Sequence, residues 1–158
     1  MCSVAIIIAE SSGRMLAILE HKNLPRPRKD GKGMCKGKPR PWDFPGGKCK
    51  DEDADERAVM TRELREETGI DADSLSRLSE ARFDVPEAKC AVFAIVVDQE
   101  FSVRAGEGVK ETAWVDRAQI SATGTYRMQR ALAVSSVFVE ESTIGTEDDD
   151  VFSVFESK

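Results

Sequence analysis

The segment from residue 42 to residue 70 constrains the chain most, because it combines a short extended piece, a glycine pair and an acidic helix. Its sequence is WDFPGGKCKDEDADERAVMTRELREETGI. Glu63, Glu66 and Glu67 are three and four residues apart, which places them on one side of a helix. Like charges so placed repel one another. Such a face is either well solvated or holds something positive.

The ends of this helix have sequence signals of their own. Asp53, followed three residues later by Glu56, predicts a capping box at the start. Gly69 suits the left-handed conformation that follows a last helical turn. The residues between these signals include no helix breaker, so we expect one continuous helix.

Apolar runs bounded by turn residues predict a sheet around this helix. Two hairpins and one further strand are expected, and a second helix with apolar Met, Leu and Val positions follows them. This order of elements predicts an α/β/α sandwich, a mixed sheet between helices. The predicted strands are 3–9, 15–20, 80–85, 89–98 and 111–116, and the second helix is 126–141.

Length and composition indicate one globular domain. The chain has 158 residues, of which 41% are hydrophobic and 33% charged. We expect a domain over residues 1–145 and an acidic tail over 146–158. No apolar run is long enough to cross a membrane. The amino terminus lacks a basic region and reaches Glu10 early, so no signal peptide and a cytoplasmic location are expected.

The cysteine and histidine content limits the chemistry. The four cysteines have no CxxC spacing, so reduced thiols are expected and a zinc site is not favoured. His21 is the single histidine, so acid and base catalysis falls to carboxylates or a metal-bound water.

A basic loop precedes the glycine pair. Residues 22–40 have eight cations against Asp30 alone, a net charge of +7, which leaves −13 for the rest of a chain whose total is −6. This loop either binds an anionic partner or is a solvated excursion. Lys38 and Arg40 lie close to the glycine turn by connectivity alone.

Together, PGGK and RELREETGI resemble the Nudix hydrolase signature, GX5EX7REUXEEXGU, in which U is a bulky aliphatic residue. The second half matches at Arg62, Glu63, Leu64, Glu66, Glu67, Gly69 and Ile70.

The first half of the signature departs by one residue. Counted forward from Gly47, the first glutamate falls at Asp53, and counted back from Arg62 it falls at Ala54. In the family this glutamate is mainly a structural partner of the arginine. Glu52 or Asp53 could serve if the loop bulges.

The resemblance implies a metal site for Mg²⁺, with Mn²⁺ as a second choice. Glu63, Glu66 and Glu67 would be catalytic residues and metal ligands, with the Gly46 carbonyl as a further ligand. Mg²⁺ is hard and is usually held by a few carboxylates together with substrate phosphates. The family often adds a carboxylate from a later loop, for which Glu107 is the first candidate and Glu111 the second.

WDFPGGK also resembles the MutT-like branch of the family. Trp42 or Phe44 could stack on a base, or both could be ordinary core aromatics. Lys38, Arg40 and Lys48 are further candidates for substrate binding. The asparagine that reads the base in MutT itself has no counterpart here, so base specificity does not carry over.

The function expected from this resemblance is Mg²⁺-dependent pyrophosphohydrolysis of a nucleoside diphosphate linked to another moiety. A nucleoside triphosphate, cleaved to monophosphate and pyrophosphate, is the leading substrate. Alternatives are dinucleoside polyphosphates, diphosphoinositol polyphosphates and RNA 5′ ends, and nucleic acid is not favoured because it needs an extended basic track. A non-catalytic nucleotide-binding module is less favoured, because the signature carboxylates are intact.

Overall fold

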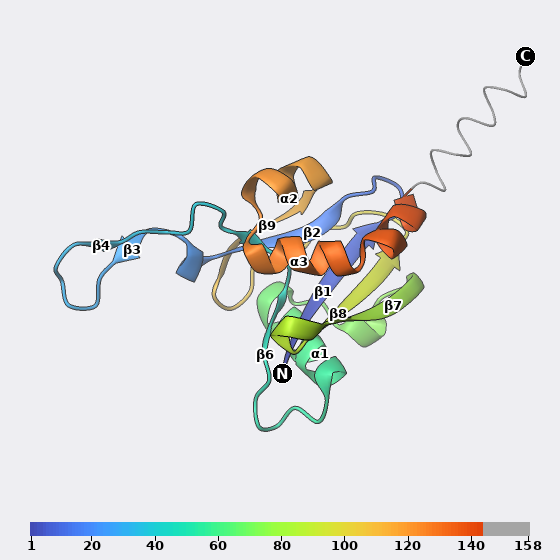
Figure 1. Cartoon of the computed structure of the whole chain (residues 1–158), viewed down its shortest axis with the longest axis horizontal. Coiled ribbons are helices and arrows are strands. Elements are labelled where there is room, and N and C mark those ends of the chain that lie inside the picture. The colour runs from blue at the N-terminus through green and yellow to red at the C-terminus, as the bar shows by residue number, and fades with distance from the viewer. Residues whose placement is uncertain (144–158) are drawn as a thin grey trace, which may run out of the picture.

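A mixed sheet forms the centre of the computed structural model, which describes residues 1–143 (Figure 1). Its strands run in the order β5-β2-β1-β8-β7, while β6 pairs with β1 and β9 pairs with β2. β1 is parallel to β8 and antiparallel to its other partners, and both predicted hairpins are confirmed. The strands are β1 (Cys2–Ala9), β2 (Met15–Glu20), β5 (Trp42–Asp43), β6 (Gly46–Lys48), β7 (Arg77–Val85), β8 (Cys90–Val97) and β9 (Val109–Val115).

Helices cover both faces of the sheet, because the side chains of the central strands alternate between two apolar cores. On one face, Ile7 packs with Met60 and Leu64 of α1 (Glu56–Thr68). On the other face, Ile6 packs with Met128 of α3 (Tyr126–Val134). The predicted α/β/α sandwich is confirmed.

The helix boundaries correct two predictions. α1 is capped by Asp55, whose side chain accepts a hydrogen bond from the Ala58 N–H at 2.8 Å, so the capping role expected for Asp53 is wrong. Gly69 follows the last turn with φ 73°, as predicted. The helix expected over 126–141 is interrupted at Ser135, and helix continues over 136–143.

Several shorter elements join these parts. α2 (Arg117–Thr123), which the sequence analysis missed, begins with a capping box formed by Asp116 and Gln119. Single 3₁₀ turns occur at His21–Asn23, Ala72–Ser74 and Pro86–Ala88. The basic loop forms a separate two-stranded sheet from β3 (Arg26–Pro27) and β4 (Met34–Cys35), which projects away from the central sheet (Figure 1).

The cysteine prediction is wrong for one pair, since Cys2 and Cys90 form a disulfide. The two residues are 88 positions apart in the chain, but they are register partners in the parallel β1–β8 ladder with Cα atoms 4.5 Å apart. That separation lies within the range a disulfide spans. Cys35 and Cys49 are free thiols.

Two further predictions concern membrane-spanning helices and the carboxyl-terminal tail. Among residues 1–143, none of the helices combines the length and the apolar character needed to cross a bilayer. The predicted acidic tail, 146–158, lies outside the described residues.

Candidate active site

Arg62 organises the acidic face of α1. Its guanidinium donates hydrogen bonds to Asp53 at 2.8 Å, to Glu63 at 3.0 Å and to Glu66 at 3.3 Å. It also donates to the carbonyl of Lys48 at 3.0 Å, which ties the helix to β6, the strand that contains the glycine pair. Two of the three predicted carboxylates are therefore held in place by one cation.

The structure shows which residue takes the place of the first signature glutamate as the partner of Arg62. Asp53 is the partner, and its side chain is only 4% exposed, whereas Glu52 is exposed. Asp53 also accepts a hydrogen bond from the Lys50 N–H at 2.8 Å, which bends the loop back on itself and absorbs the extra residue. The hydrogen bond from Arg62 lowers the pKa of Asp53.

The glycine pair lies directly against the carboxylates. The Gly46 N–H donates to the Glu67 carboxyl at 2.8 Å. A Cβ placed on Gly47 would lie 2.4 Å from Glu63 Oε1, and one on Gly46 would lie 2.3 Å from the Ser3 carbonyl oxygen. Close approach of the Ser3 backbone therefore requires glycine at Gly46, whereas a side chain at Gly47 would displace the Glu63 carboxylate.

Glu67 contacts a carboxylate that the sequence analysis missed. Glu20, the last residue of β2, is 7% exposed and Glu67 is 5% exposed. Burial, together with the hydrogen bond to Glu20, raises the pKa of Glu67 to about 9. Burial opposes ionisation of Glu20 as well, but the hydrogen bond from Glu67 and the Lys22 ammonium lower the pKa of Glu20. In the free protein, a protonated Glu67 thus faces an ionised Glu20.

The loop before β9 docks on the end of α1. The Gly106 N–H donates to the carbonyl of Glu67 and the Glu107 N–H to the carbonyl of Glu66, both at 2.8 Å. A Cβ on Gly106 would lie 2.1 Å from the Glu66 carbonyl oxygen, so glycine permits this contact. These hydrogen bonds place Glu107, whose side chain is exposed, beside the carboxyl end of α1.

Glu111 lies on the opposite face of the sheet. It alternates with Ala113 and Val115, which pack in the core beneath α3 rather than beneath α1. Of the two later candidates, the geometry thus favours Glu107.

These residues fit a hard divalent cation. Within the described chain, no three acidic, cysteine or histidine side chains already converge on one point. Cations instead lie against the carboxylates, with Arg62 on Glu63 and Glu66, and Lys50 Nζ 3.9 Å from Glu66. One buried carboxylate oxygen, Glu20 Oε2, has no hydrogen-bond partner. An all-oxygen donor set of this kind suits Mg²⁺ or Mn²⁺.

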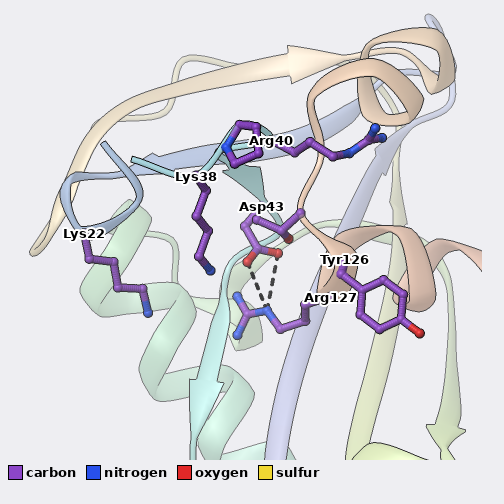
Figure 2. A pocket seen from close by; sticks show the side chains of 8 residues that line it. Lys22, Lys38, Arg40, Asp43, Tyr126 and Arg127 are labelled. Atoms are coloured by element: carbon purple, nitrogen blue, oxygen red, sulfur yellow. Dashed lines mark hydrogen bonds and ion pairs between the residues drawn. The ribbon is translucent and has the colours of Figure 1, made fainter. Parts of the chain in front are cut away.

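A basic cavity of about 420 Å³ adjoins the carboxylates through Lys22. Lys22 lines this cavity, and its Nζ lies 3.2 Å from Glu20 Oε2. Figure 2 shows Lys22, Lys38 and Arg127 pointing toward one another. Arg127 is held by Asp43 at 3.2 Å and donates to the Phe44 carbonyl at 3.0 Å. Three cations from three separate segments thus face one space.

The other substrate-binding candidates have different surroundings. Arg40 lines the cavity, but its guanidinium points to α2, where it donates to the carbonyls of Ser121 and Gly124 (Figure 2). Phe44 is fully buried in the core, so its ring offers no surface to a base and the stacking expectation does not suit it. Trp42 is half-buried against the same core. Lys48 is exposed on β6.

A smaller, mainly apolar cavity of about 180 Å³ lies next to the basic one. Val4, Val85 and Val92 line it from the sheet, and Tyr126 and Arg127 line both cavities. The two spaces therefore meet at the start of α3.

The NUDIX domain family model matches residues 2–134. The chain belongs to the Nudix family. This membership confirms the predicted Nudix hydrolase assignment. A MutT-type relative, the 8-oxo-dGTP diphosphatase of Proteus vulgaris, is 44% identical to this Nudix chain over 46 residues. That match covers 29% of this chain and 40% of the relative, so it spans less than half of either protein.

Solved structures share the fold of this Nudix protein at low sequence identity. The Ap4A hydrolase of C. elegans is 15% identical with a TM-score of 0.60, over 89% of this chain and 99% of that one. The dihydroneopterin triphosphate pyrophosphohydrolase of E. coli is 16% identical with a TM-score of 0.56, over 91% and 94%. A bifunctional NMN adenylyltransferase/ADP ribose pyrophosphatase of Francisella tularensis, complexed with AMP and an Mn ion, is 19% identical with a TM-score of 0.60, over 87% and 41%.

Sequence reasoning found the residues on the helix and missed those that the sheet brings to it. Glu20 ends the otherwise apolar strand MLAILE, and a carboxylate in that place was the available signal. Lys22 was counted only as one of the loop cations. Asp43 and Arg127 are 84 residues apart, and nothing in the sequence indicates their pairing.

Proposed function

We propose that this Nudix protein is a Mg²⁺- or Mn²⁺-dependent pyrophosphohydrolase that cleaves a nucleoside triphosphate to its monophosphate and pyrophosphate. The observation that carries the proposal is that the glycine pair and the Glu107 loop both hydrogen-bond to the carboxyl end of α1, where the glutamates lie, next to a basic cavity. A polyphosphate needs both cations and metal-binding oxygens, and here the two kinds of group adjoin.

Different residues would bind the metal, orient its ligands and accept a proton. Glu63, Glu66, Glu67, Glu107 and the Gly46 carbonyl are the candidate ligands, of which a single Mg²⁺ would use only some, because it keeps positions for water and substrate phosphate. When bound, the metal neutralises phosphate charge and lowers the pKa of a water. Arg62 orients Glu63 and Glu66 through its hydrogen bonds, and a glutamate of this group would accept the proton of the attacking water.

Charge in the basic cavity supports a substrate with several phosphates. Lys22, Lys38 and Arg127 would contact the phosphate oxygens, and a guanidinium can bind them in a bidentate manner. The adjoining apolar cavity, which Tyr126 lines, would receive part of the nucleoside. Arg40 instead anchors the loop to α2.

The similar proteins support a nucleotide or polyphosphate substrate but do not identify the compound. The named activities of the similar proteins concern 8-oxo-dGTP, Ap4A, dihydroneopterin triphosphate and ADP-ribose. Dinucleoside polyphosphates are therefore the second candidate, ahead of diphosphoinositol polyphosphates and RNA 5′ ends. The intact carboxylates argue against a non-catalytic module. A cytoplasmic location stays a prediction.

A substrate screen tests this proposal. Nucleoside triphosphates, oxidised nucleoside triphosphates, dinucleoside polyphosphates and ADP-ribose would be incubated with the protein in Mg²⁺, in Mn²⁺ and in EDTA, and the products identified by chromatography. We expect monophosphate and pyrophosphate from at least one triphosphate, with no reaction in EDTA. Hydrolysis of no compound, with full metal binding, would favour the non-catalytic module.

A further inference from the structure

Glu20 lies outside the Nudix signature but inside the acidic site. It ends β2 on the face that α1 covers. Leu16 of the same strand packs in the α1 core, and Glu20 is an even number of residues further along, so it lies on the same face. The pairing of β2 with β9 shifts register between Leu19 and Glu20. Such irregularities bend a strand locally and re-aim the side chain that follows.

One carboxylate oxygen of Glu20 is left without a hydrogen bond within the described part of the protein. The residue is 7% exposed, and its Oε2 is buried without a hydrogen-bond partner. The Lys22 ammonium lies 3.2 Å from Oε2 as an ion pair, outside hydrogen-bonding geometry. Glu67, a buried carboxyl as well, is the neighbouring group. A buried carboxylate oxygen without a hydrogen bond destabilises a fold, so packing alone does not explain this one.

We propose that Glu20 is an additional ligand of the divalent metal, which it shares with Glu67. The inference rests on the proposed function, because that function supplies the metal. One or two carboxylates together with substrate phosphates are the usual protein ligands of Mg²⁺. A cation between Glu20 and Glu67 would supply a ligand interaction for the Glu20 oxygen that lacks a hydrogen bond.

Lys22 has a matching role. In the free protein its ammonium supplies the positive charge beside Glu20. Once a metal takes that place, Lys22 is released toward the basic cavity that it already lines, next to Lys38 (Figure 2). Metal binding and the gain of one phosphate-binding cation are then linked.

The test is Mn²⁺ binding, measured on the full chain by the EPR signal of free Mn²⁺, with no substrate present. We expect Glu20→Gln to weaken Mn²⁺ binding at least about tenfold, the scale seen when residues that support a metal ligand are removed. Lys22→Gln should tighten binding several-fold, because a competing cation is lost. The matched control is Glu111→Gln, which removes a carboxylate from the adjacent strand on the other face of the sheet and should bind as the wild type does.

The outcomes separate this inference from the proposed function. Equal Mn²⁺ affinity in wild type and Glu20→Gln would overturn the role of Glu20 while leaving the enzyme assignment intact. A wild type that binds no Mn²⁺ would instead refute the proposed function. If Glu20→Gln does not fold, as judged by circular dichroism, Lys22→Gln decides: a lower melting temperature with unchanged Mn²⁺ affinity would mean a merely structural ion pair.

Discussion

The buried carboxyl of Glu67 makes the stability of the metal-free protein depend on pH. Its pKa is about 9 in the folded protein, because the group is buried beside Glu20, against 4.5 as the ordinary value. Between these pH values the folded state holds a proton that the unfolded state has lost. The stabilisation is therefore complete below about pH 4.5 and is lost as the pH rises toward 9.

Replacing Glu67 by glutamine removes this dependence, because an amide does not titrate. The free energy of unfolding of the wild type should fall relative to that of Glu67→Gln by at most about 1.4 kcal/mol per pH unit. From pH 5 to pH 8 the relative loss is on the order of a few kcal/mol. Glutamine retains an oxygen to accept the Gly46 N–H and a donor toward Glu20, so the packing is conserved.

The assay is urea denaturation in EDTA at pH 5, 6, 7 and 8 for wild type, Glu67→Gln and the control Glu111→Gln. Titrating groups distant from Glu67 contribute alike to all three proteins, so the difference between the wild-type and Glu67→Gln curves reports Glu67 and its neighbour Glu20. A constant difference between wild type and Glu67→Gln across this range would mean that the pKa of Glu67 is not raised in the folded protein. Added Mg²⁺ should stabilise the wild type more at pH 8 than at pH 5, because a ligand carboxylate must be ionised.

Three further variants test the surrounding geometry. Asp53→Asn should lower the melting temperature more than Glu52→Gln, because only Asp53 pairs with Arg62, and equal shifts would contradict that pairing. Gly47→Ala should reduce kcat by about tenfold or more, because its Cβ would displace the Glu63 carboxylate and misplace a catalytic group. The melting temperature of this variant measures any general loss of stability. Lys38→Gln should raise KM for triphosphates, because Lys38 lines the basic cavity. Neutralising Arg26, Arg28 and Lys29 together should leave KM unchanged, because the hairpin that holds them projects away from the central sheet. A larger KM effect of the triple variant would show that the hairpin folds over the substrate.

Local patterns predicted the fold well. The apolar run of β1 and the end signals of α1 were sufficient to predict these elements, because both can be read from neighbouring residues. The helix start was misplaced by two residues because Asp53 and Asp55 are equally good caps by type. Only the position of Arg62, which engages Asp53, decides between them.

The candidate site was predictable only where it is contiguous. Glu63, Glu66, Glu67 and the glycine pair lie within one segment, so their spacing was sufficient. Glu20 and the Cys2–Cys90 disulfide depend on which strands become neighbours and in what register, and no local pattern encodes that pairing. The basic cavity likewise needs Lys22, Lys38 and Arg127 to converge from separate segments.

The proposed function requires that carboxylates of α1 hold a metal that catalyses pyrophosphohydrolysis. Its most direct test is the rate of pyrophosphate release from the best triphosphate in Mg²⁺, compared between wild type, Glu66→Gln and the exposed control Glu52→Gln. We predict that Glu66→Gln folds normally and loses at least about a hundredfold in kcat, the scale of losing several kcal/mol of metal-based stabilisation, while Glu52→Gln stays near the wild type. Near-normal turnover in a well-folded Glu66→Gln protein would contradict the account.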